Sequence, residues 1–281
     1  MELPLTRARL PRVLWRESSP STNAELRELA SAAELPHGTL LATAHQTAGR
    51  GRLDRGWVTP PASAVASSIL IRSFGAGPDP DPAADPLGIG WLPLLVGSAM
   101  TAALQPRFGE GMRVGVKWPN DVHVRDEEDA VAGRPGKKLC GILCEMLPDG
   151  SVIVGAGINL LIDEWDLPTE RATSLLAAGA DVGGAQSLAD PAGAGLADEV
   201  LDAYAGELLR LVRLATSDPG AARARVARHS LTLGTEVRVH LPGGETIDGR
   251  ARALAADGSL TVDLPTGGEL TVSAGDVEHL R

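Results

Sequence analysis

The segment 46–57 reads QTAGRGRLDRGW, and it concentrates residues suited to anion binding more densely than any other part of the chain. Three arginines, Arg50, Arg52 and Arg55, stand among three glycines. Glycine lets the backbone approach an anion closely and line it with N–H groups. Arginine makes planar, bidentate contacts with phosphate or carboxylate. The combination suits a phosphate ester of a small acid, although a solvated basic turn explains so short a stretch equally well.

A second cluster, KWPND at 117–121, is followed downstream by Lys138. Lysine is a mobile point charge that can follow a phosphate. Asp121 could hold Mg²⁺, which prefers one or two carboxylates together with phosphate oxygens. An Asn-Asp turn with its own hydrogen bonds is the structural alternative. A third motif, GAGIN at 155–159, permits nucleotide contact or merely close strand packing, so it is weak evidence by itself.

The pattern of apolar residues around these clusters predicts an α+β domain. It lacks a regular βαβ rhythm, which favours a mixed, largely antiparallel sheet. Thr22 and Glu25 fit a capping box at the start of a helix. We expect an exposed connection at 74–88, a hairpin-like loop at 126–136 and irregular structure at 161–193. The predicted strands are 11–17, 40–43, 64–72, 114–118, 138–146 and 151–160, and the predicted helices are 22–33, 91–105, 196–214 and a shorter one ending near His229.

The pattern of apolar and polar residues changes after Gly234. Apolar residues alternate with polar ones in short runs at 237–241, 260–264 and 270–272, separated by glycine-rich turns. This pattern predicts a small β-barrel, closed to protect its edge strands. We therefore divide the chain into a first domain, 1–229, and a second domain, 230–281.

Composition narrows the class of protein. The 281 residues carry 26 Lys and Arg against 36 Asp and Glu, a formal net charge of −10. That balance argues against broad contact with a nucleic-acid backbone, which needs clustered cations. No stretch approaches the roughly 20 apolar residues of a membrane span, and residues 1–16 lack the apolar core of a secretory signal. We expect a cytoplasmic protein without a DNA or membrane partner, whose two cysteines, Cys140 and Cys144, are small packing residues rather than a disulfide or metal site.

The order of the motifs resembles the biotin–protein ligase family. The matching segments are STN at 21–23, GRGR at 49–52, KWPND at 117–121, KLCGIL at 138–143 with Glu145, GAGIN at 155–159, and the terminal segment 273–281. The resemblance implies a catalytic domain like that of class II aminoacyl-tRNA synthetases, followed by an SH3-like β-barrel. It also implies activation of biotin by ATP and Mg²⁺ as biotinyl-5′-AMP. The biotinyl group would then pass to a lysine of the biotin carboxyl-carrier domain of an acyl-CoA carboxylase, acetyl-CoA carboxylase or a related enzyme.

The resemblance assigns roles to individual residues. The catalytic residues it implies are Lys138, Arg50 and Asp121. The biotin-binding residues it implies are Ser21, Thr22, Asn23, Gln46, Gly49, Arg50, Gly51, Arg52, Lys138, Gly141 and Gly157. The residues it implies for ATP and the adenylate are Arg50, Arg52, Lys117, Trp118, Asn120, Lys138, Asn159 and Trp165, the last within a loop at 161–173 that covers the adenine.

The sequence departs from the family pattern at Asp54, where glycine is usual, and an acidic residue there should weaken anion binding unless its side chain points outward. Three alternatives stay open. One is a biotin-responsive DNA-binding repressor, although only about twenty residues precede Ser21. The others are a lipoate–protein ligase and a non-catalytic binding module. For acyl transfer, a neutral lysine amine must form although free lysine titrates near pH 10.4. Asp121 is our candidate for the proton acceptor.

Overall fold

The computed structural model describes residues 1–52, 55–72, 74, 87–241, 244–273 and 275–280. Most of the predicted connection at 74–88 lies outside these residues, and so does Asp54. In the described part of the chain, none of the helices has both the length and the apolar character needed to cross a membrane.

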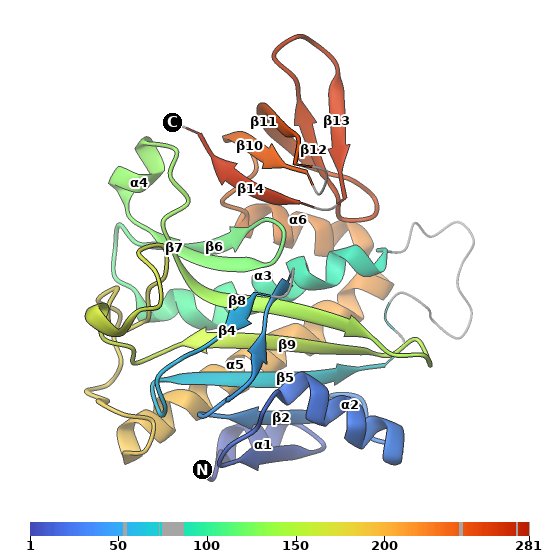
Figure 1. Ribbon diagram of the computed structural model, residues 1–281. Coiled ribbons are helices and arrows are strands. Elements are labelled where there is room, and N and C mark those ends of the chain that lie inside the picture. Colours follow the sequence, from blue (N-terminus) through green and yellow to red (C-terminus); the bar gives the residue numbers. More distant parts are fainter. Residues whose placement is uncertain (53–54, 73, 75–86, 242–243, 274, 281) are drawn as a thin grey trace.

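A seven-stranded sheet forms the centre of the first domain (Figure 1). β1 pairs with β2 in parallel, and every other neighbouring pair is antiparallel. The predicted mixed, largely antiparallel sheet is therefore confirmed. In spatial order the strands are β1 (Val13–Arg16), β2 (Leu40–Thr43), β5 (Ala64–Ile71), β9 (Val152–Asn159), β8 (Lys137–Met146), β7 (Asp121–Arg125) and β6 (Arg113–Lys117).

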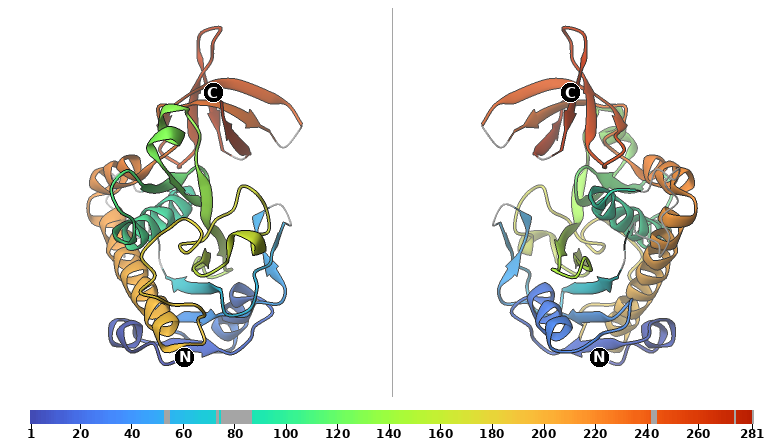
Figure 2. Two further views of the ribbon diagram at one scale, coloured as in Figure 1. Left: turned by 90° about the vertical axis from the view of Figure 1, so that its left-hand side faces the viewer. Right: turned by 90° about the vertical axis from the view of Figure 1, so that its right-hand side faces the viewer.

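Both faces of this sheet are covered. Successive side chains of a strand point to opposite faces, and on this sheet they enter two different clusters. On β5, Ile69 and Ile71 join the main core while Leu70 joins a smaller cluster with Leu26 of α2 (Thr22–Ala32). The helices of the main core lie on one side of the sheet, opposite α2 and the short ribbon of β3 (Gly49–Arg50) and β4 (Gly56–Trp57) (Figure 2). They are α3 (Leu92–Leu104), α5 (Pro191–Ser217) and α6 (Pro219–His229).

The helix α5 carries the apolar face that the sequence predicts. Leu201, Tyr204, Leu208 and Leu211 are all fully buried, and burying one such side chain contributes about 1.5–3 kcal/mol. The helix begins at Pro191, earlier than expected, because the Asp190 side chain accepts a hydrogen bond from the backbone at its first turn. Its buried Asp198 accepts hydrogen bonds from Thr6, and this holds the N-terminal helix α1 (Pro4–Arg9) in place.

Two local predictions were wrong. Ser21, not Thr22, is the N-cap of α2, because Ser21 Oγ accepts from the Ala24 amide at 3.4 Å. Glu25, the other predicted partner in the capping box, instead pairs with Arg16. The segment 126–136 is not a simple hairpin loop: it contains the short helix α4 (Glu127–Val131), whose acidic first turn suits the positive end of a helix.

The two cysteines lie on one strand, β8, and neither forms a disulfide. Burial raises the pKa of the Cys140 thiol far above its usual range. It raises the pKa of Cys144 to about 12. Both thiols are therefore protonated and unreactive at neutral pH, which agrees with their predicted role in packing.

The second part of the chain forms a five-stranded antiparallel sheet. α6 ends at His229 and β10 begins at Glu236, on either side of the boundary placed at 230. The division into 1–229 and 230–281 remains a prediction. In spatial order the strands are β13 (Glu269–Val272), β12 (Leu260–Asp263), β11 (Thr246–Leu254), β10 (Glu236–His240) and β14 (Asp276–His279).

Buried tryptophans join the two parts. Trp91 Nε1, in the 3₁₀ turn η2 (Ile89–Trp91), donates to the Ala256 carbonyl at 2.8 Å. Trp118 Nε1 donates to the Gly258 carbonyl at 3.1 Å. Indole N–H groups need such partners when they are buried, so these bonds orient the C-terminal sheet on the first domain. The two remaining 3₁₀ turns are η3 (Gln105–Arg107) and η4 (Glu164–Asp166).

We predict that the protein loses stability as pH falls from about 6.5 towards 4, the range between the unfolded and folded histidine values. Burial, with help from Arg225, lowers the pKa of His229 to about 4. Burial, with help from Lys117, lowers that of His279 to about 3. The unfolded chain binds protons in this range that the folded protein excludes, so stability is complete only above pH 6.5.

Urea unfolding at pH 7, 6 and 5 measures this effect. His279→Gln should flatten the dependence of the unfolding midpoint on pH, whereas the exposed His45→Gln should leave it as in the wild type. Equal slopes for wild type and His279→Gln would contradict the prediction.

Candidate active site

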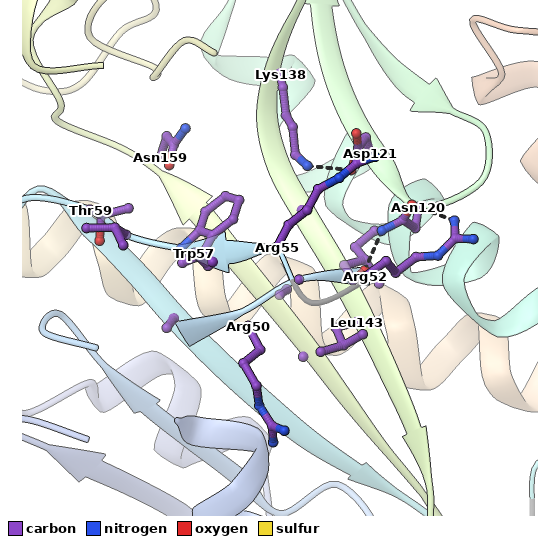
Figure 3. Close-up of a pocket in the computed structure, with 18 of the residues that line it drawn as sticks. Arg50, Arg52, Arg55, Trp57, Thr59, Asn120, Asp121, Lys138, Leu143 and Asn159 are labelled. Carbon is purple, nitrogen blue, oxygen red and sulfur yellow. Dashed lines mark hydrogen bonds and ion pairs between the residues drawn. The ribbon is translucent and has the colours of Figure 1, made fainter. Parts of the chain in front are cut away.

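One elongated cavity of about 390 Å³ brings most of the predicted site residues together. It lies on the sheet face opposite α3 and α5, and its walls come from β5, β7, β8, β9, the segment after η4 and the 46–59 region (Figure 3). The predicted residues that line it are Ser21, Thr22, Asn23, Gln46, Arg50, Gly51, Arg52, Lys117, Asn120, Asp121, Lys138, Gly141 and Asn159.

The glycine–arginine segment forms a short two-stranded ribbon, which the sequence did not predict. β3 (Gly49–Arg50) pairs antiparallel with β4 (Gly56–Trp57). The Gly51 amide donates to the Arg55 carbonyl at 2.6 Å. A Cβ at Gly49 would lie 2.4 Å from the Trp57 carbonyl oxygen, so only glycine fits where the ribbon closes. The ribbon holds its arginines above the sheet.

Each of the three arginines contacts a different protein acceptor. Arg50 lies 3.9 Å from Glu145 and points away from Lys138 and Asp121 (Figure 3). Arg52 Nη1 donates to Asn120 Oδ1 at 3.1 Å. Arg55 pairs with Asp276, a residue of the C-terminal sheet. The guanidinium groups are thus spread along the cavity, and an incoming anion must compete with these partners.

The cationic end of the cavity is organised around Lys138 and Asp121. Lys138 Nζ lies 2.7 Å from Asp121 Oδ1, and His123 Nε2 lies 3.8 Å from Asp121 Oδ2. Burial opposes ionisation of Asp121, but His123 and the Lys138 charge outweigh it and hold the pKa of this carboxyl well below its usual range. Burial also lowers the pKa of His123, despite the nearby carboxylate. At neutral pH Asp121 is therefore ionised beside Lys138 Nζ.

The other end of the cavity contains a network of buried hydroxyl and amide side chains, and Arg50 points toward this end. Ser68 Oγ lies 2.6 Å from Asn23 Oδ1 and 2.8 Å from Thr22 Oγ1. Asn23 Nδ2 donates to the Leu143 carbonyl at 3.2 Å, and Gln46 Oε1 accepts from the Thr22 amide at 2.9 Å. These buried hydroxyl and amide groups suit a small neutral head group with its own donors and acceptors. Ser68 belongs to this network although sequence reasoning missed it, because it lies within an apolar strand.

Trp57 is the second residue that sequence reasoning missed. Its indole lies against β9 and β8, where a Cβ at Gly157 would come within 2.3 Å of the ring and one at Gly141 within 2.9 Å. Lys138 Nζ is 5.7 Å from the ring centroid, within the range of a cation–π contact. The signal was present in the sequence, because Trp57 ends the quoted segment in a chain with only 3% aromatic residues.

Four predicted residues do not line the cavity. Trp57 covers Gly157, and Gly49 is enclosed by the ribbon. Trp118 is buried against the C-terminal sheet. Trp165 is 85% exposed. Asn159, in contrast, lines the cavity; its Nδ2 donates to the Thr173 carbonyl at 2.8 Å, and its buried Oδ1 has no hydrogen-bond partner within the described ranges.

A protein-bound magnesium ion does not fit the residues present. The described residues contain no cluster of three or more His, Cys, Asp or Glu that could hold a metal ion. Among the residues that the structure describes, the carboxylates lining the cavity are those of Asp121 and Asp276, and they are already paired with Lys138 and Arg55. The earlier suggestion that Asp121 holds Mg²⁺ therefore gains no support from this arrangement.

Comparison with protein-family models identifies the class of protein. The model described as the biotin/lipoate A/B protein ligase family matches residues 15–163, just over half of the chain. The chain belongs to this family. A model described as the biotin protein ligase C terminal domain matches residues 232–280.

Relatives of known name agree with this assignment. The chain is 35% identical over 273 residues to a biotin–[acetyl-CoA-carboxylase] ligase of Mycobacterium tuberculosis, a match that covers 95% of this chain and 90% of the relative. It is 33% identical over 131 residues to the bifunctional ligase/repressor BirA of Escherichia coli, which covers 45% of this chain and 34% of that protein.

Solved structures show the same fold. The biotin protein ligase from Aquifex aeolicus in complex with biotin and ATP superposes with a TM-score of 0.67 at 24% identity, covering 97% of this chain and 100% of that one. The biotin protein ligase from Leishmania major in complex with biotinyl-5-AMP gives a TM-score of 0.56 at 22% identity, covering 94% and 99%. The predicted α+β fold is thus that of the biotin protein ligases.

We predict that Gly157→Ala destabilises this ligase-family protein. The added methyl group cannot enter the space held by the Trp57 indole, and overpacking of this kind costs about 1–3 kcal/mol. Urea unfolding followed by circular dichroism measures the loss. Gly56→Ala is the matched control on the same ribbon, because a Cβ there meets nothing within 4 Å. Equal unfolding free energies for Gly157→Ala and wild type would show that the indole moves aside freely.

Proposed function

We propose that the protein activates biotin with ATP as biotinyl-5′-AMP and transfers the biotinyl group to a lysine of a biotin carboxyl-carrier domain. The observation that carries the proposal is one cavity that has hydroxyl and amide side chains at one end and the Lys138–Asp121 pair at the other. Strand β8 runs along it, with Leu143 at the polar end and Lys138 at the cationic end. Five residues of strand span roughly 16 Å, which accommodates a head group, an acyl chain and a phosphate in line.

The polar end favours biotin over lipoate, although the family includes ligases for both. The ureido ring of biotin offers donors and an acceptor to Thr22, Asn23 and Gln46, which line the cavity. The dithiolane ring of lipoate offers none of comparable strength. The polar groups at this end already hydrogen-bond one another or the Leu143 carbonyl, so biotin gains contacts with the network that lipoate cannot make. One such hydrogen bond contributes about 0.5–1.5 kcal/mol net, and we expect the cavity to favour biotin.

The first half-reaction depends on positioning and charge. The carboxylate of biotin is ionised at neutral pH and needs no general base to attack the α-phosphorus of ATP. The bond between the carboxylate oxygen and the α-phosphorus forms as the bond between the α-phosphorus and the oxygen of pyrophosphate breaks. Lys138, held in place by Asp121, lies where it can offset charge on the phosphate that is being transferred. Arg50 and Arg52 contribute further positive charge along the same cavity. Mg²⁺ bound to the phosphate oxygens of ATP would neutralise the leaving pyrophosphate.

In the second half-reaction the amine of a carrier lysine attacks the acyl carbon, and AMP leaves. The amine must first lose a proton. Asp121 is ionised and lines the cavity, so we retain it as the proton acceptor. Its low pKa means that it would hold the proton only briefly before releasing it to solvent. The carrier belongs to the class named in the Mycobacterium relative, the acetyl-CoA carboxylases, and the cytoplasm is the compartment that we expect.

Biotin-dependent exchange of labelled pyrophosphate into ATP tests the first step directly. Exchange with biotin and not with lipoate is the expected result. Exchange with lipoate alone would keep the family and change the substrate. A folded protein that shows no exchange with either acid would overturn the proposal and favour a non-catalytic binding role.

We predict that Lys138→Ala lowers the exchange rate about 10²-fold or more, the usual effect of removing one group that stabilises a developing charge. Lys137→Ala is the matched control. Lys137 precedes it on β8, is exposed and does not line the cavity. The rate of exchange at saturating biotin and ATP is the measurement. A Lys138→Ala rate equal to that of Lys137→Ala would remove Lys138 from the mechanism.

We predict that Asp121→Asn slows acyl transfer from preformed biotinyl-5′-AMP by about 10²-fold, because the variant lacks the proton acceptor. Single-turnover transfer to a biotin carboxyl-carrier domain measures this step separately from adenylation. Raising the pH should partly restore the rate, since more of the attacking amine is then neutral. An unchanged transfer rate at pH 7 would exclude Asp121 as the acceptor.

A further inference from the structure

The edge strand β14 of the C-terminal sheet faces the active-site cavity. It pairs with β10 along one side, and its other side is directed at the first domain (Figure 1). Asp276, at its start, lines the cavity although it lies 138 residues beyond Lys138 in the sequence. The C-terminal sheet therefore contributes a carboxylate, in addition to that of Asp121, to a site rich in lysine and arginine.

Three successive residues of β14 each hold a cation from a different segment of the first domain. The Asp276 carboxylate pairs with Arg55 of the ribbon. The Val277 carbonyl accepts from Lys117 Nζ at 2.7 Å. The Glu278 carboxylate lies 3.5 Å from Arg171 Nη2. Arg171 lies next to Ala172, which lines the cavity, and Lys117 lines it as well. One strand thus engages three cations located beside the proposed phosphate region.

The two ion pairs of β14 are weak enough for a bound phosphate to replace the carboxylates. The side chains of Arg55 and Asp276 are 64% and 40% exposed, and those of Arg171 and Glu278 are 85% and 43% exposed. Exposed ion pairs contribute only about 0–1 kcal/mol and are screened by salt. A triphosphate carries several negative charges and binds arginine in bidentate geometry. It can therefore displace a single carboxylate from Arg55.

We propose that Asp276 competes with the phosphates of the nucleotide for Arg55, so that the C-terminal domain limits how tightly the site holds ATP. The inference rests on the proposed nucleotide-binding function of the cavity. Asp276 acts through Arg55 and is a positioning residue, not a catalytic one. It keeps the ribbon in place while the site is empty, and it returns to Arg55 when the phosphates leave. The return of Asp276 to Arg55 thereby favours the release of pyrophosphate or AMP from the phosphate end of the cavity.

The test compares ATP affinity by isothermal titration calorimetry in the absence of biotin, so that no adenylate forms. Asp276→Asn should bind ATP about two- to fivefold more tightly than wild type at low ionic strength, the factor expected for an exposed ion pair. The gain should shrink at high salt. The matched control is Asp248→Asn, which makes the same change in net charge but removes a carboxylate paired with Arg238 on the neighbouring strand, outside the cavity.

A double-mutant cycle gives the decisive comparison. In an Arg55→Gln background, Asp276→Asn should change ATP affinity no more than Asp248→Asn does. Unchanged or weaker ATP binding by Asp276→Asn, or an equal gain with and without Arg55, would overturn the inference. Thermal unfolding of each variant verifies that the fold is retained. Biotin-dependent pyrophosphate exchange by the wild type is scored separately: exchange without the Asp276 effect refutes this inference alone, and the Asp276 effect without exchange refutes only the proposed ligase activity.

Discussion

The close packing of the Trp57 indole on Gly141 and Gly157 is the contact on which the site depends. The two glycines lie on β8 and β9, in the middle of a sheet that is buried on both faces. The ring approaches both strands closely enough to occupy the space of a Cβ at each glycine, so the indole determines where the ribbon rests. The ribbon in turn determines where the arginines stand. The contact between the Trp57 indole and these two glycines therefore connects the core of the protein to its proposed phosphate region.

The electrostatics of the site contrast with those of the whole chain. A protein with a net charge of −10 nonetheless gathers lysine and arginine around one cavity. Each of these cations has a partner: Asp121 for Lys138, Asn120 for Arg52 and a more distant Glu145 for Arg50. Such partners hold the cations in place before any anion arrives, and preorganised charge is more effective than charge that must be rearranged during the reaction.

The C-terminal sheet participates in the same arrangement. Hydrogen bonds from Trp91 and Trp118 place it on the first domain, and β14 then reaches the edge of the cavity. Trp118 was predicted to contact the nucleotide, yet its indole N–H is used to hold the C-terminal sheet. The side chains of the KWPND motif consequently face two parts of the protein: Trp118 faces the second domain, and Asn120 and Asp121 face the cavity. This division explains how one short motif can serve both stability and chemistry.

Much of this protein could be predicted from its sequence, because some signals are local. Apolar periodicity located six of the seven strands of the central sheet, all but β7, and the long helix α5. The order of the short motifs indicated the family and many of the residues that line the cavity. Other features depend on contacts between distant segments. Ser68 in an apolar strand and Asp276 beside Arg55 carry no local signature of their roles. Trp57 stands out in the sequence as a rare aromatic residue, but its packing over two glycines does not. Only the folded chain brings residues 23 and 68, or 55 and 276, within hydrogen-bonding distance. Local patterns report what each segment can form, whereas long-range packing decides which side chains meet and which charges are left for a ligand.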